Sequence, residues 1–172
     1  MSDALWIVVV VGLGITQALQ VSLLGAMGRV RGPSEAAFVP ILGTFVGLSA
    51  VLTIRGARGE RPLLPSPFDN PAVMGVLSVC TGAILLLALR GLPGGFLITG
   101  LLALPYLLVA SFLAPRIGVG LFLAALITGQ LTGGMLLDQF GFLGGATRPV
   151  DVLRIVGCLM LLGGVVLVRG FR

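Results

Sequence analysis

The side chains that could do chemistry in this sequence are few, and they are densest between residues 127 and 157. Gln130 lies inside an apolar run that ends on Asp138, and the next apolar run begins with Asp151 and Arg154, three residues apart. A charge at the centre of a bilayer costs at least about 2.5–3.5 kcal/mol, so these charges are expected near the headgroups or paired with each other. A structural or gating pair of Arg154 with Asp138 or Asp151 is the favoured interpretation, and binding of a coupling ion is the alternative.

Two more amides lie in the first apolar run. Gln17 falls a little past the middle of that run, at a depth similar to that of Gln130 in the fifth run, and Gln20 is close by. With six spans the first and fifth helices run the same way, so the amides of Gln17 and Gln130 could lie at one level. Either these amides bond neighbouring helices together, at about 0.6–2 kcal/mol per bond, or they contact a substrate in a central cavity.

Several classes of site are excluded or disfavoured by the residues that are missing. There is no histidine, which excludes histidine-ligated metals and histidine acid–base catalysis. Cys80 and Cys158 lie in apolar segments and are expected to be buried hydrophobes. No carboxylate lies deep inside an apolar run, which counts against a simple buried-acid proton exchanger. We therefore predict no enzyme, no metal and no cofactor.

The composition is that of an integral membrane protein. The chain is 57% hydrophobic and 10% charged, whereas a soluble domain is about a quarter charged. Its mean hydropathy is +1.15. The net charge of +5 comes from arginines between apolar runs, where they anchor helix ends at lipid headgroups. With no basic face and no aromatic platform, nucleic acid is not an expected partner, whereas membrane lipids are.

The apolar runs predict an all-helical bundle. Alternation with a period of two is absent and the runs are too long for barrel strands. We predict one integral membrane domain over residues 1–172 with about six transmembrane helices, or five if the third run is re-entrant. The predicted spans are residues 4–27, 36–54, 72–89, 96–113, 118–137 and 150–168.

Small residues recur at intervals of four and form stripes along several predicted helices. Such stripes let two helix backbones approach closely. The pairs singled out for helix packing are Gly43 with Gly47 and Gly129 with Gly133. We expect oligomerisation to use these stripes, and a leucine at Gly43 or Gly47 to force helices apart whichever neighbour they face.

The arginines give only a weak signal for orientation. With six spans, six arginines fall on the side of the termini and five on the other, whereas the positive-inside rule needs an imbalance. One interpretation is a single, weakly biased orientation. The other is insertion in both orientations followed by antiparallel pairing, which would make this chain one half of an inverted repeat.

The polar residues of the last two runs resemble the closing signature of the YdcZ-like family, in the drug/metabolite transporter superfamily. The matching residues are Gly129-Gln130, Asp138, Phe140-Gly141, Arg154 and Gly157. The sequence departs from the family pattern at Val21, where the family usually has asparagine, and in its additional run over residues 72–89. Five spans are usual in that family, so this run makes six.

The resemblance implies a transporter of a small, unidentified solute in the cytoplasmic (inner) membrane. The functional hypothesis is therefore a multi-pass transporter that works as a homo-oligomer, most simply a dimer, with its pathway lined by the first and fifth helices. Gln17, Gln20 and Gln130 are its candidate substrate-binding residues. The alternative is a membrane assembly or scaffold subunit that transports nothing, and solute flux in proteoliposomes separates the two.

Overall fold

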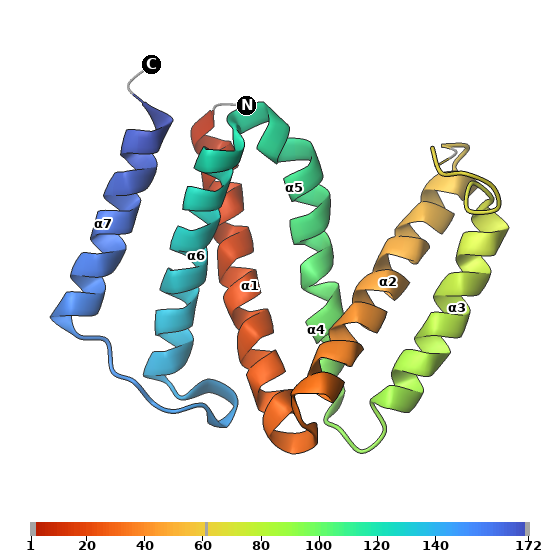
Figure 1. The fold of residues 1–172 in the computed structure, drawn as a ribbon, viewed down its shortest axis with the longest axis horizontal. Helices are drawn as coiled ribbons and strands as arrows, with labels where there is room; N and C mark the ends of the chain where they lie inside the picture. Colours follow the sequence, from red (N-terminus) through yellow and green to blue (C-terminus); the bar gives the residue numbers. More distant parts are fainter. Residues whose placement is uncertain (1–2, 61, 171–172) are drawn as a thin grey trace. The chain divides into compact units, whose positions relative to one another are not determined.

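The structure, a computed structural model, describes residues 3–60 and 62–170, and every regular element in these ranges is a helix (Figure 1). This confirms the predicted all-helical bundle. The chain forms two compact units: a central unit of residues 27–104 and a terminal unit of residues 1–26 and 105–172. Arg61 and Arg172, two of the arginines counted for orientation, lie outside the described residues.

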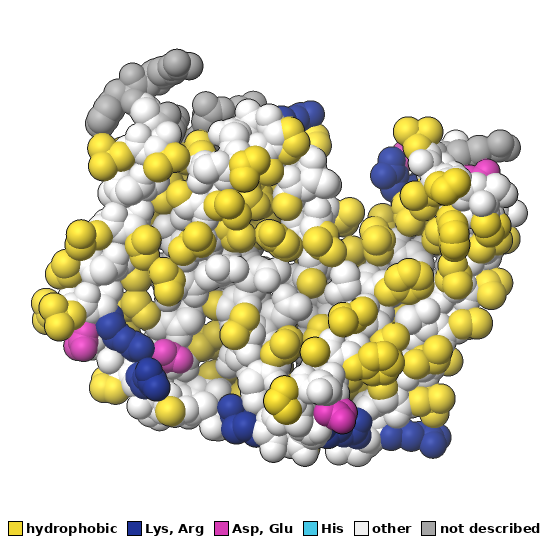
Figure 2. All heavy atoms as spheres, viewed as in Figure 1, with side chains coloured by type: hydrophobic (Ala, Val, Ile, Leu, Met, Phe, Trp, Pro, Cys, Tyr) yellow, Lys and Arg dark blue, Asp and Glu magenta, His cyan; other side chains and the backbone are white. Residues whose placement is uncertain are grey.

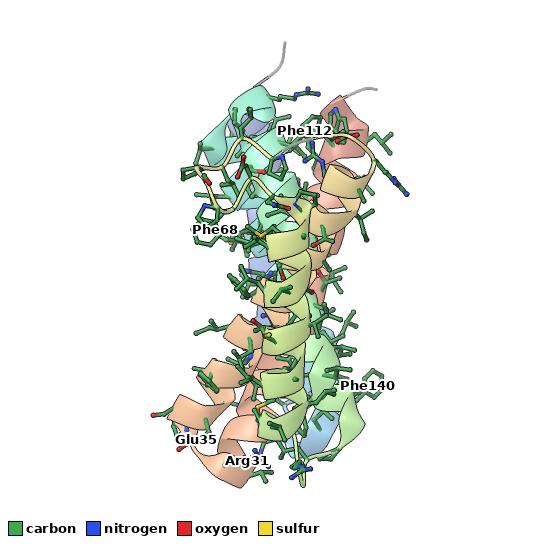
Figure 3. All side chains as sticks on the ribbon, turned by 90° about the vertical axis from the view of Figure 1, so that its right-hand side faces the viewer. Arg31, Glu35, Phe68, Phe112 and Phe140 are labelled. Atoms are coloured by element: carbon green, nitrogen blue, oxygen red, sulfur yellow. The ribbon has the colours of Figure 1, made fainter. Side chains whose placement is uncertain are left out.

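The central unit is built on two long helices joined by a proline-rich loop, α2 (Pro33–Ala57) and α3 (Pro71–Ala88). At one end a Cβ added to Gly56 would lie 2.6 Å from Pro71 Cβ, so the two helices meet there directly. At the other end the Arg31 guanidinium donates to the carbonyls of Ala88 and Arg90. Figure 3 shows Arg31 at this end of the unit and Phe68 at the opposite one. Arg31 therefore stabilises the end of α3.

α2 also packs closely against a short helical segment made of η1 (Gly94–Leu97) and α4 (Ile98–Leu101). A Cβ added to Gly100 would lie 2.6 Å from Pro40 O, and one added to Gly43 would lie 2.9 Å from Gly100 Cα. Thr44 Oγ1 lies 2.8 Å from Pro40 O and 2.9 Å from Gly100 O. The stripe at Gly43 is therefore occupied within the chain, where we had expected a contact between copies.

The helix that follows is interrupted at Leu102, between α4 and α5 (Ala103–Ile117). Pro105 lies three residues further on. A proline lacks the amide that would bond the carbonyl four residues back, and its ring clashes with that carbonyl. The carbonyl in question belongs to Leu101, so the distortion lies before the proline. The chain passes from the central to the terminal unit at this point.

The terminal unit contains α5, α6 (Val119–Gln139), η2 (Phe142–Gly144), α7 (Val152–Arg169) and the first part of α1 (Asp3–Arg31). Its core is a cluster of buried apolar residues from α1, α5, α6 and α7. The cluster consists of Val10, Leu13, Leu113, Phe122, Ala125, Leu126 and Val165. Trp6 packs against this cluster and edge-on to Phe112, with ring centroids 6.0 Å apart.

α1 and α6 touch through their small residues. A Cβ added to Gly14 would lie 2.7 Å from Gly129 Cα, and one added to Gly133 would lie 3.0 Å from Ala18 Cβ. Real Cβ atoms essentially never come within 3.0 Å of another heavy atom, so no larger side chain fits at Gly14 or Gly129. Both contacts advance four residues along each helix, so α1 and α6 run in the same direction, as predicted from the three spans that lie between them.

Within residues 3–60 and 62–170, five helices are long and apolar enough to cross a membrane, and a sixth apolar helix, over residues 152–168, is shorter. The segment considered as re-entrant is a continuous 18-residue helix, α3. Large apolar side chains are exposed along the helices, as at Val79, Leu153 and Met160, each more than 70% exposed. Figure 2 shows the charged side chains gathered near helix ends. Such surfaces are stable in lipid and not in water.

Candidate substrate site on α6

One edge of α6 carries two of the polar residues singled out from the sequence, Gln130 and Asp138. Gln130, Gly134 and Asp138 follow one another at intervals of four, so they lie above one another on the same edge of the helix. Gly134 has nothing within 4 Å of the place where its Cβ would be. The edge therefore has an amide at one end, a carboxylate about 12 Å of helix rise away, and open space between them.

A groove lies on each side of this edge. The first, the α1–α6 groove, has a volume of about 390 Å³. Its lining residues are Ala18, Val21, Ser22, Ile127, Gln130, Leu131, Gly134, Leu137 and Asp138. The second, the α6–α7 groove, has a volume of about 340 Å³. Its lining residues are Gln130, Leu131, Gly134, Met135, Asp138, Arg154, Gly157, Cys158 and Leu161. Gln130, Gly134 and Asp138 thus face both grooves.

Gln130 is half-buried, and within the described part of the chain its amide has no hydrogen-bond partner. The neighbouring polar side chains of α6 differ in this respect. Thr128 and Thr132 donate to the carbonyls of Ala124 and Thr128, each at 2.8 Å. An amide without a partner in an apolar environment costs free energy unless something else bonds it. Gln130 therefore has its bonding capacity open toward the grooves.

Asp138 and Arg154 join the ends of α6 and α7. Arg154 Nη2 lies 3.3 Å from Asp138 Oδ2, and the two side chains are 30% and 46% exposed. Asp151 has a different role: its Oδ1 accepts a 2.8 Å bond from the backbone amide of Arg154 and caps the start of α7. The ion pair thus connects Arg154 to Asp138, while Asp151 satisfies the open end of the helix.

The loop between α6 and α7 is held by further bonds that the sequence did not indicate. The amide of Arg148 donates to Asp138 O at 2.9 Å, and the amide of Val150 donates to Gln139 Oε1 at 2.6 Å. One helix turn further into the unit, Cys158 Sγ lies 3.1 Å from Met135 Sδ. Sequence spacing carries no signal for these contacts, because they depend on how α7 is set against α6.

Gln17 and Gln20 are half-buried on α1 and line neither groove. Their register is as expected, because α1 and α6 run in parallel with Gly14 beside Gly129. However, among the described residues no hydrogen bond joins Gln17 to Gln130. The structure therefore brings Gln130, Asp138 and Arg154 together and leaves Gln17 and Gln20 outside this group.

The long apolar helices, their exposed apolar surfaces and the polar edge inside one unit define a polytopic helical membrane protein. The chain belongs to the family described as "Putative inner membrane exporter, YdcZ", whose family model matches residues 5–167. It is thus a multi-pass inner-membrane protein, and the family supports a transport role rather than an enzymatic one. The resemblance drawn from residues 129–157 is confirmed. No curated protein and no solved structure matches the chain.

Proposed function

We propose that this protein exports a small solute across the inner membrane as a dimer, with the polar edge of α6 as its binding surface. The observation that carries the proposal is Gln130: its half-buried amide has no partner within the described chain and faces two grooves. Both grooves fall in the size range of small-molecule sites, which are mostly apolar with a few placed polar groups. Membership in an exporter family supplies the transport role.

The dimer is supported by what the grooves leave uncovered. Ile127 and Leu131 line the α1–α6 groove and are still 43% and 45% exposed, so a solute there would touch lipid. A second copy packed over this side would enclose the groove and keep a polar solute away from hydrocarbon. The near-equal distribution of arginines makes an antiparallel copy one of the two arrangements to be tested, the other being a copy of the same orientation.

The test is the substitution Gln130→Leu, with Gln20→Leu as its matched control. Both remove a half-buried amide, but only Gln130 lines the grooves. Purified variants in proteoliposomes are loaded with a mixture of small metabolites, and efflux is followed by mass spectrometry. We expect Gln130→Leu to abolish the efflux seen with the wild type, without changing the melting temperature or the oligomeric state, and Gln20→Leu to preserve efflux.

Two outcomes count against the proposal. If Gln130→Leu retains efflux but loses about 1 kcal/mol of stability, the amide only holds helices together. If the wild type moves no solute in either membrane direction, the protein is not a transporter, and an assembly or scaffold role takes its place. Crosslinking in intact membranes, with the oligomeric state as readout, tests the dimer separately.

A further inference from the structure

We propose that the solute taken by the α6 grooves is a small organic monocation with an apolar body. Its cationic group pairs with the Asp138 carboxylate and displaces Arg154 from it. This rests on the proposed function, because it names the chemical class of the exported solute. It follows from the charge, the ion-pair geometry and the shape of the α1–α6 groove.

The charge of the groove is carried by one residue. Of the nine residues that line the α1–α6 groove, Asp138 is the one with an acidic or basic side chain, and Ser22 and Gln130 are its neutral polar groups. An anion entering this groove would meet a carboxylate with no cation among the lining residues. A monocation would pair with it, in surroundings where low polarity strengthens the attraction between opposite charges.

The arginine that now pairs with Asp138 reaches it from the other groove and holds it loosely. The 3.3 Å distance from Arg154 Nη2 is longer than the 2.7–2.9 Å of a strong charge-assisted bond, and only one such contact is made. Arg154 Nη1 is also within 3.3 Å of Arg148 O, in the α6–α7 loop. The guanidinium therefore keeps an acceptor on the loop when another cation takes the carboxylate.

The shape of the groove fits an apolar body beside the charge. Val21, Ile127 and Leu137 supply apolar walls, and the open space over Gly134 leads from the carboxylate toward the Gln130 amide. A ligand with its cationic group at Asp138 would lay its apolar part across Gly134. The competing class is a zwitterion, which would use Arg154 for its negative group in the α6–α7 groove.

The test uses ligands that share a benzyl group and differ in charge, on the purified protein in nanodiscs and proteoliposomes. The probes are benzyltrimethylammonium, its uncharged isostere neopentylbenzene, the anion phenylacetate and the zwitterion phenylalanine. Binding is measured as Kd and as the shift in melting temperature, and flux is measured by mass spectrometry. We expect saturable binding and flux of benzyltrimethylammonium, with at least tenfold weaker binding of the other three probes.

Variants test whether Asp138 binds the cation and whether Arg154 competes with it. Asp138→Asn should weaken benzyltrimethylammonium binding at least tenfold, and Gln20→Leu should leave it unchanged. Arg154→Gln removes the competing cation and should tighten binding of benzyltrimethylammonium several-fold without affecting neopentylbenzene. This second variant keeps the inference testable if Asp138→Asn does not fold.

Three results would overturn the inference. Unchanged cation binding in folded Asp138→Asn would remove the carboxylate from the site, and unchanged cation binding in Arg154→Gln would show that the arginine does not compete. Flux of phenylacetate, phenylalanine or neopentylbenzene in preference to the cation would leave the exporter intact and refute the solute class. Asp138-dependent binding of the cation without flux of any solute would instead support the site and refute the export function.

Discussion

Gly14 of α1 and Gly129 of α6 are packed backbone against backbone, so that a Cβ added to Gly129 would lie 2.9 Å from Gly14 Cα. The contact brings together two glycines that lie more than a hundred residues apart in the sequence. Because the backbones touch, α6 is held beside α1 in a defined rotation, and this rotation leaves Gln130 and Asp138 at the α1–α6 groove.

A methyl group at this contact should separate the helices. Gly129→Ala would place a Cβ against the backbone of α1, and overpacking of this kind costs about 1–3 kcal/mol. We expect a melting temperature lower by several degrees in detergent. The control is Gly134→Ala, five residues along the same helix, where nothing lies within 4 Å and no loss is expected. Equal melting temperatures for the two variants would mean that the helices do not touch at Gly129.

The glycines of the central unit should differ in sensitivity according to what they touch. An added Cβ at Gly100 or Gly43 meets backbone, whereas one at Gly47 meets the flexible ends of Leu101 and Leu104. We expect Gly43→Ala and Gly100→Ala to cost about 1–3 kcal/mol and Gly47→Ala less, because leucine side chains can move aside. Thermal unfolding with Gly82→Ala as the unobstructed control checks this order. A larger loss at Gly47 than at Gly43 would contradict it.

The oligomeric state of the same glycine variants tests whether these glycines contact a second copy of the chain. Gly43 and Gly47 are covered by residues of their own chain, so they are not free for a second copy. We expect Gly43→Ala to lower stability without changing the ratio of dimer to monomer at a temperature where the protein is folded. A dimer lost before unfolding would place the stripe at the contact between copies instead.

Asp151 should affect the stability of the first turn of α7 and not the binding of a charged solute. Asp151→Ala removes the acceptor for the Arg154 amide, and loss of such a cap costs about 0.5–2 kcal/mol. Asp151→Asn keeps an acceptor oxygen and should restore most of this stability. Hydrogen exchange at the first turn of α7 measures the effect locally. Faster exchange in Asp151→Asn as in Asp151→Ala would show that the charge, not the cap, stabilises the turn.

We predict six crossings, which would place both termini on one side of the membrane. Single cysteines in place of Ser2, which lies outside the described residues, and of Gly170, just after α7, report this when Cys80 and Cys158 are replaced by serine. We expect both positions to react with an impermeant maleimide from the same side within a population of one orientation. Reaction from opposite sides would reduce the number of crossings to five and make the short apolar helix, residues 152–168, peripheral.

Chain composition and local spacing determined the helices and their approximate limits. Backbone groups in hydrocarbon must bond within their own segment, so long apolar runs have helix as their available structure. The predicted run over residues 72–89 corresponds to α3 at Pro71–Ala88, and the run over 118–137 corresponds to α6 at Val119–Gln139. Asp138, Arg154 and Gln130 could be singled out because polar groups are rare and costly in such runs.

The tertiary structure alone decided which faces of these helices meet. A helix that is apolar all round has no marked face to direct it toward a neighbour, so periodicity could not tell that Gly14 meets Gly129 or that Gly43 meets Gly100. For the same reason the sequence could not distinguish Gln17 from Gln130, which lie at similar depth. In the structure Gln130 lines two grooves and Gln17 lines neither. Rotation about the helix axis depends on close packing of small residues far apart in the sequence, and that packing exists only once the helices have assembled.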